Sequence, residues 1–169
     1  ARGGHSMKRS TWAGLGAVRL TVTVRNPRRA RHAGGYWELG DPGSVVLDEL
    51  ALDLLTGAPI DSSRWSIERG EALAEAGVPA LVYQEASGGA YWLSTVHLNA
   101  AGRVPMRHRG YRAISAAGSR EGLRATPLVS VETGASQLAV TLPEFWERFP
   151  RLLSVEPDGV RVGIFPAEF

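Results

Sequence analysis

The amino-acid sequence predicts a mostly β protein, built as a small barrel or a sandwich. In most segments apolar residues recur with a period of two, and glycine, proline, aspartate and serine separate these segments at short intervals. The 169 residues are enough for one domain with a sizeable core. Roughly eight or nine short strands, with one or two short helices, fit an all-β barrel or sandwich.

Three segments in the first half of the chain have the pattern expected of strands. Residues 17–24, AVRLTVTV, alternate apolar and polar side chains and are rich in β-branched residues. Residues 44–54 alternate in the same way, which favours a strand over a helix. The sequence DSSRWSIE at 61–68 is typical of a turn that leads into a short strand.

The middle of the chain predicts a hairpin and two further strands. Residues 79–86 and 91–99 are interpreted as strands joined by Ser87-Gly88-Gly89, a sequence typical of a hairpin turn. Shorter strands are expected at 110–115 and 128–133.

The last third of the chain predicts a strand, a helix and a hairpin. The strand covers 137–142, and Pro143 then suits the first turn of a short helix that Pro150 ends. Residues 152–165 form a hairpin whose turn is Pro157-Asp158-Gly159.

Composition excludes several classes of site. The chain has no cysteine, which excludes disulfides, zinc–thiolate sites and thiol nucleophiles. No apolar run approaches the roughly 20 residues that cross a membrane, so no membrane partner is expected. We interpret residues 1–7, ARGGHSM, as a vector remnant and residues 8–169 as a single β-barrel domain. The protein is expected to be exported if a signal peptide has been removed, and cytoplasmic otherwise.

The first Gly-aromatic segment, residues 26–44, contains Tyr36 and Trp37 after two glycines, preceded by Arg31 and His32. One interpretation is a structured loop whose aromatic side chains plug one end of a barrel. The alternative is a site for a sugar acid, because flat aromatic faces stack on pyranose rings and arginine binds carboxylates in a bidentate manner. The spacing is not that of a phosphate-binding loop.

The second Gly-aromatic segment carries Tyr91, Trp92 and His97. In an extended strand Tyr91 and His97 share one face but lie about 20 Å apart, at roughly 3.3 Å per residue. They therefore do not form a close catalytic pair on a straight strand. A lone histidine on a strand is more often a structural hydrogen-bonding group than a base.

A basic segment at 103–112 includes Arg107 and His108. It is interpreted either as a solvated edge that discourages pairing between sheets or as an anion-binding rim. Binding of single-stranded nucleic acid is the weaker alternative, since the net charge is only +2. No nucleophile elbow, HExxH sequence or helically spaced pair of metal-binding carboxylates occurs, so neither a metal nor a cofactor is predicted.

Residues 24–50, VRNPRRARHAGGYWELGDPGSVVLDEL, and residues 84–112, QEASGGAYWLSTVHLNAAGRVPMRHRGYR, resemble the N-terminal region of the exo-rhamnogalacturonan lyase-like polysaccharide lyase family. The resemblance covers about residues 20–169 and includes the closing VRVGIFP. It implies a RIFT-type β-barrel, with six strands and extra hairpins, that precedes an α/α-toroid domain and a β-sandwich in a longer protein.

The resemblance implies that the full protein performs β-elimination on a uronic-acid-containing polysaccharide and that this module, which is not catalytic alone, supports or lines the cleft. Its expected partners are an acidic polysaccharide and the C-terminal domains of the same protein. Two departures from the family pattern are Ala90-Tyr91 and Val96, where polar residues are expected. The residues expected to bind substrate are Arg31, His32, Tyr36, Trp37, Tyr91, Trp92, His97, Arg107 and His108. A purely structural barrel that docks to the other domains is the alternative.

Overall fold

The computed structural model describes residues 4–11, 14–26, 47–89, 106–134 and 136–167. In this part of the chain there are twelve strands and no helix, so the mostly β prediction is confirmed. The chain divides into two compact units, Ala1–Leu47 and Asp48–Phe169, and each is described by itself.

The first unit contains an antiparallel hairpin of β1 (Gly4–Thr11) and β2 (Val18–Arg25). Met7 lies opposite Val22 in the register, and Lys8 lies opposite Thr21. The strand predicted at 17–24 is therefore confirmed. Strand β1 also includes Gly4–Met7, which belong to the segment interpreted from the sequence as a vector remnant.

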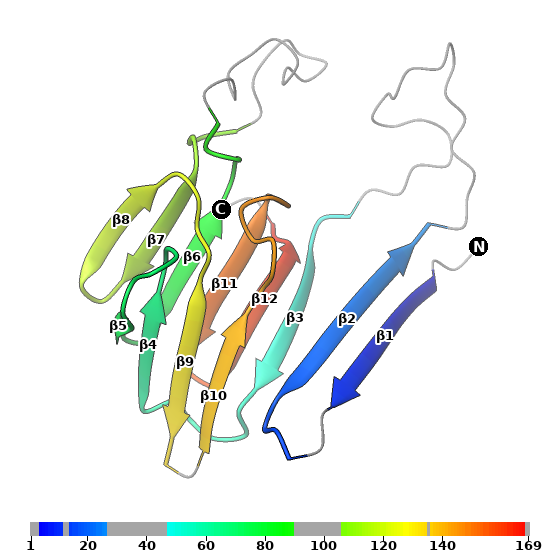
Figure 1. Ribbon diagram of the computed structural model, residues 1–169, viewed down its shortest axis with the longest axis vertical. Coiled ribbons are helices and arrows are strands. Elements are labelled where there is room, and N and C mark those ends of the chain that lie inside the picture. The colour runs from blue at the N-terminus through cyan, green and yellow to red at the C-terminus, as the bar shows by residue number, and fades with distance from the viewer. Residues whose placement is uncertain (1–3, 12–13, 27–46, 90–105, 135, 168–169) are drawn as a thin grey trace. The chain divides into compact units, whose positions relative to one another are not determined.

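The second unit consists of two antiparallel sheets (Figure 1). The larger sheet has the strand order β3 (Leu50–Leu55), β12 (Gly159–Phe165), β11 (Arg151–Glu156), β6 (Ala80–Gln84), β7 (Tyr111–Ser115) and β8 (Gly118–Gly122). The smaller sheet has the order β10 (Ser136–Thr141), β9 (Leu128–Thr133), β4 (Ser62–Ser66) and β5 (Ala74–Glu75).

The two sheets pack face to face over one hydrophobic core. Val82 and Leu153 from the larger sheet, and Val129 and Val131 from the smaller, are completely or almost completely buried in it. Among the described residues no strand pairing joins the two sheets into a closed barrel. The predicted RIFT-type barrel is therefore corrected to a two-layer sandwich, because the apolar faces are buried by stacking rather than by closure of one sheet.

The short helix predicted from Pro143 to Pro150 is wrong. This segment forms turns with one helical hydrogen bond, from Arg148 N–H to the Glu144 carbonyl at 3.1 Å. Glu144 has a φ of 55°, outside the right-handed helical region. Phe145, which is only 1% exposed, anchors the segment in the core. Burial of this ring outweighs the helix-starting signal of proline in a segment too short to sustain a helix.

Two further differences concern strand pairing. Strand β6, the first half of the predicted hairpin, lies between β11 and β7, and these two strands occupy both of its edges. Residues 91–99, the other half of that hairpin, lie outside the described residues. Strand β8 was not predicted because its sequence, GSREG, is mostly polar and its residues are largely exposed. Main-chain pairing with β7 extends the sheet to include it.

We expect the core at Leu153 to dominate the stability of the sandwich. Leu153 pairs with Val82 in the register, and both side chains are completely buried. Leu153→Ala should lower the free energy of unfolding by about 2–5 kcal/mol, because it removes buried methyl groups and leaves a cavity. Leu55→Ala is the control, since Leu55 is 72% exposed and its loss should cost less than about 0.5 kcal/mol. Urea unfolding of both variants checks this, and similar losses would contradict a single core at Leu153.

Candidate functional site

The structure describes two of the predicted binding residues, Arg107 and His108. The others lie outside the described residues, namely Arg31, His32, Tyr36, Trp37, Tyr91, Trp92 and His97.

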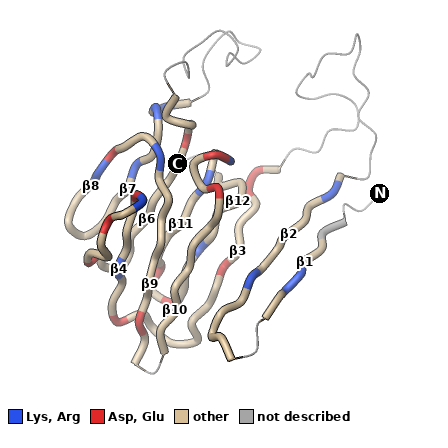
Figure 2. The backbone as a smooth tube through the Cα atoms, viewed as in Figure 1, with Lys and Arg blue, Asp and Glu red and all other residues tan. Residues whose placement is uncertain are grey.

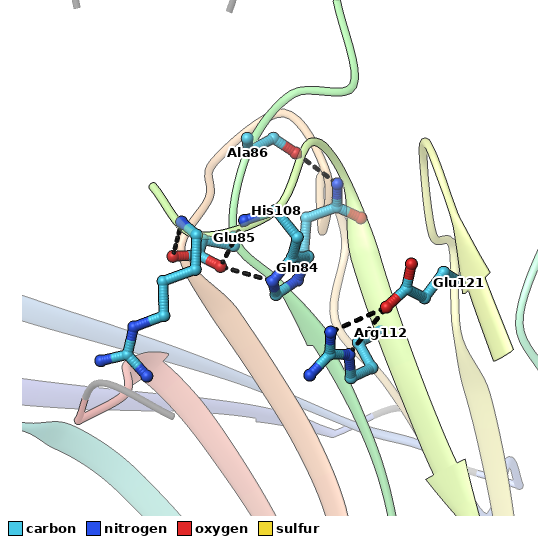
Figure 3. A network of polar contacts seen from close by, with 7 residues as sticks. Gln84, Glu85, Ala86, His108, Arg112 and Glu121 are labelled. Carbon is cyan, nitrogen blue, oxygen red and sulfur yellow. Dashed lines mark hydrogen bonds and ion pairs between the residues drawn. The ribbon is translucent and has the colours of Figure 1, made fainter. Parts of the chain in front are cut away.

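Glu85 follows β6 directly, and its carboxylate binds two residues of the basic segment, Arg107 and His108 (Figure 3). Its Oε1 accepts a hydrogen bond from the backbone N–H of Arg107 at 2.6 Å. Its Oε2 accepts from the backbone N–H of His108 at 3.2 Å and lies 2.5 Å from His108 Nδ1. The His108 ring also meets the edge of Tyr83, with 5.9 Å between ring centroids. These contacts give His108 a structural role in joining the end of β6 to the start of β7.

An open groove lies beside Gly88 and Gly89, the glycines that the sequence singles out. The residues that line it are Glu68, Gly88, Gly89, Gly122, Leu123 and Arg124. Gly88 has a φ of +68°, and a Cβ added there would lie 2.5 Å from the carbonyl oxygen of Leu123. Only glycine satisfies both the left-handed backbone and the close approach of the two chain segments.

Arg124 is held in place at this groove without a carboxylate partner. Its guanidinium carbon lies 4.3 Å from the centroid of the Trp146 ring, a cation–π contact. Its Nε–H donates to the carbonyl of Ser87 at 3.2 Å. Among the described residues no ion pair or hydrogen bond engages its two terminal nitrogens. A guanidinium held in this way can bind a carboxylate by donating two parallel N–H···O hydrogen bonds.

Arg124 is one of the described arginines of the second unit that make no ion pair with a described carboxylate, together with Arg69, Arg109 and Arg151. Figure 2 shows basic and acidic positions distributed over several strands of this unit. Several arginines there make ion pairs with carboxylates, namely Arg64, Arg112, Arg120, Arg148 and Arg161. Their charges are therefore already matched within the protein.

The groove's carboxylate, Glu68, belongs to a hydrogen-bonded cluster. Tyr111 donates its hydroxyl proton to Glu68 Oε1 at 2.6 Å, and Arg120 Nη2 lies 3.3 Å from the same oxygen. Arg120 also pairs with Glu71 at 2.6 Å. Burial, followed by the hydrogen bond to Glu68, raises the pKa of Tyr111 well above its usual value, so the phenol stays protonated and donates.

Glu71 is the most strongly perturbed acid of this cluster. The hydrogen bond from Arg120 is the largest cause that lowers the pKa of Glu71 from 4.5 to about 2, and the backbone N–H groups of Glu68 and Ile67 act in the same direction. Burial opposes the shift. The same hydrogen bond raises the pKa of Arg120. Glu68, which lines the groove, is thus hydrogen-bonded to Tyr111 and paired with Arg120, and Arg120 also holds Glu71 in its ionised form.

Together these residues suit a polar ring whose only charged group is a carboxylate. Arg124 supplies a cation with donors, Glu68 supplies acceptor oxygens, and Leu123, which is 49% exposed, supplies an apolar contact. In the described part of the chain no three histidine, aspartate or glutamate side chains are grouped so as to hold a metal ion.

Sequence reasoning missed Arg124, Trp146 and Glu68. Arg124 and Trp146 are separated by 22 positions (146 minus 124), and neither lies in a segment with a binding motif. Of the residues that line the groove, the sequence pattern indicated only Gly88 and Gly89, because a glycine pair indicates unusual backbone angles or close packing.

Comparisons of this chain with protein-family models, with curated proteins and with solved structures found no match.

We expect an added side chain at Gly88 to destabilise the fold through its collision with Leu123 as well as through the left-handed backbone angle. Gly88→Ala should lower the free energy of unfolding by roughly 2–4 kcal/mol, because a left-handed alanine is strained and its Cβ collides with Leu123. Gly57→Ala is the matched control, since Gly57 has a similar φ of +74° but open space around it. It should cost only about 1–2 kcal/mol. Denaturant unfolding of both variants is the measurement, and equal losses would mean that Leu123 does not press on Gly88.

We expect the Glu71–Arg120 pair to stabilise the fold above about pH 5 and not at low pH. The folded pKa of Glu71 lies below its unfolded value, so the stabilisation is lost as the pH falls from about 4.5 towards about 2. Glu71→Gln should therefore lower Tm near pH 6, and the difference from the native protein should shrink as the pH falls.

The control is Glu121→Gln, which removes an exposed carboxylate that pairs with Arg112. Thermal unfolding of the three proteins over this pH range distinguishes the effects. A Tm difference for Glu71→Gln that stays constant with pH would contradict the assignment.

Proposed function

We propose that this chain is a non-catalytic module that binds uronic-acid-containing polysaccharide of the rhamnogalacturonan kind, as the N-terminal part of a polysaccharide-lyase-like protein. The observation that carries the proposal is Arg124, which is stacked on Trp146 at the groove with both terminal nitrogens unengaged among the described residues. The resemblance of the Gly-aromatic segments to the lyase-like family supplies the substrate class.

The chemistry of the groove supports a uronate in particular. A carboxylate on the sugar ring pairs with the Arg124 guanidinium through two parallel N–H···O bonds. Hydroxyl groups of the sugar donate to the free acceptor positions of Glu68, and the C–H face of the ring packs on Leu123.

The proposal assigns the elimination step to other domains of the full protein. That step needs a base beside the proton to be removed and a cation on the carboxylate. Arg124 suits the second task. Glu68, the carboxylate that lines the groove, is already engaged by the Tyr111 hydroxyl and by Arg120, which suits binding rather than proton removal.

A titration with defined oligosaccharides tests the proposal. A trisaccharide of galacturonate should shift the NMR signals of Gly88, Gly89, Leu123 and Arg124, whereas the neutral trisaccharide of galactose should shift them far less. Arg124→Gln should weaken binding of the galacturonate probe about tenfold or more, because a carboxylate then lacks its charged partner.

The matched control is Arg112→Gln, which removes an exposed arginine on β7 that already pairs with Glu121. It should leave the affinity unchanged. Absence of any shift with the galacturonate probe, or equal effects of the two arginine variants, would contradict the proposal.

A structural docking module is the second candidate, and exposed apolar side chains favour it. Leu55 on β3 is 72% exposed, and Phe165 on β12 is 49% exposed. They lie on the neighbouring strands β3 and β12, at opposite ends of the pair, because Leu55 is opposite Gly159 and Phe165 is opposite Leu50. In that case the galacturonate titration gives no shift, and substitution of Leu55 and Phe165 by serine weakens association with the C-terminal domains.

A further inference from the structure

One buried side-chain amide connects both walls of the groove. Gln84 is the last residue of β6 and is completely buried. Its Nε2 donates to the carbonyl of Ala86, as Figure 3 shows, and to the carbonyl of Leu123 at 2.8 Å. Its Oε1 accepts from the backbone N–H of Ala125 at 2.9 Å. The amide therefore uses both donors and its acceptor within the protein.

The partners of Gln84 are the peptide groups that hold the groove residues. Ala86 precedes Ser87 and Gly88 on one wall, while Leu123 and Ala125 flank Arg124 on the other. The three hydrogen bonds of this one planar amide, two donated and one accepted, thus fix the separation of the two walls. The bond from Arg124 Nε to the Ser87 carbonyl spans the same gap and depends on that separation.

We propose that Gln84 is a positioning residue that preorganises Arg124 for a carboxylate ligand and sets the width of the groove. The positioning rests on the contacts of Gln84 alone, whereas the identity of the ligand rests on the proposed function. Preorganisation matters because a guanidinium that is already fixed loses little conformational freedom when it binds an anion.

The chemistry explains why other residues would not replace Gln84. Glutamate has the same shape but, when ionised, places an acceptor against two carbonyl oxygens. Asparagine is one methylene shorter, which separates the amide from the Leu123–Ala125 segment. Methionine fills a similar volume but leaves the Ala86 and Leu123 carbonyls and the Ala125 N–H without this partner.

The experiment measures the position of Arg124 without any ligand. Stacking on Trp146 should displace the Arg124 Hδ signals upfield through the ring current of the indole. In Gln84→Met that displacement should fall by at least half. Ser154→Ala is the control, because Ser154 is a buried polar residue on the neighbouring strand β11 whose hydroxyl bonds to Glu156 rather than to the groove. It should keep the full displacement.

A purely structural role for Gln84 predicts a different result. A folded Gln84→Met protein with reduced stability but an unchanged Arg124 displacement overturns the proposal. If Gln84→Met does not fold, Gln84→Asn provides the same readout, and an unchanged displacement there overturns the proposal as well.

Affinity for the galacturonate trisaccharide gives the second readout. The proposal expects Gln84→Met to weaken binding about tenfold, and Ser154→Ala to leave it unchanged. If the native protein does not bind this probe, the proposed function fails, while the Hδ displacement still decides whether Gln84 positions Arg124.

Discussion

Burial of the inner faces of two antiparallel sheets against each other is the constraint on which the second unit depends. Each sheet is apolar on one face, and hydrophobic burial pairs these faces around Val82, Leu153, Val129 and Val131. Such a core is close-packed, and the residues at the ends of its strands are attached directly to it. The candidate site uses the end of β6, where Gln84 and Glu85 bond to the segments on either side.

Strand β6 shows how the core directs the chemistry. It is the fourth strand of the larger sheet, between β11 and β7. Successive residues of an extended chain point to opposite sides. At the end of β6, Gln84 bonds to the Leu123–Ala125 segment, while the next residue, Glu85, bonds to Arg107 and His108. One strand end thereby organises the groove on one side and the basic segment on the other.

The contacts of Arg124 distinguish it from the arginines of the unit that form ion pairs. Exposed ion pairs, such as Arg112 with Glu121, add little to stability and leave no charge for a ligand. Arg124 is instead held by an aromatic ring and a backbone carbonyl. Neither contact neutralises its charge. A positive group that is fixed and still unpaired among the described residues is the feature that points to an anionic ligand.

Alternation and turn residues are local signals, so the sequence by itself determined many of the strands, although not β8, whose sequence is mostly polar. The strand at 128–133 and the hairpin around Pro157-Asp158 agree with the structure for this reason. The tertiary structure decided the rest: whether the sheets close or stack, that the segment with the buried Phe145 forms turns, and that Trp146 contacts Arg124. These outcomes depend on contacts between distant parts of the chain, which no local pattern encodes.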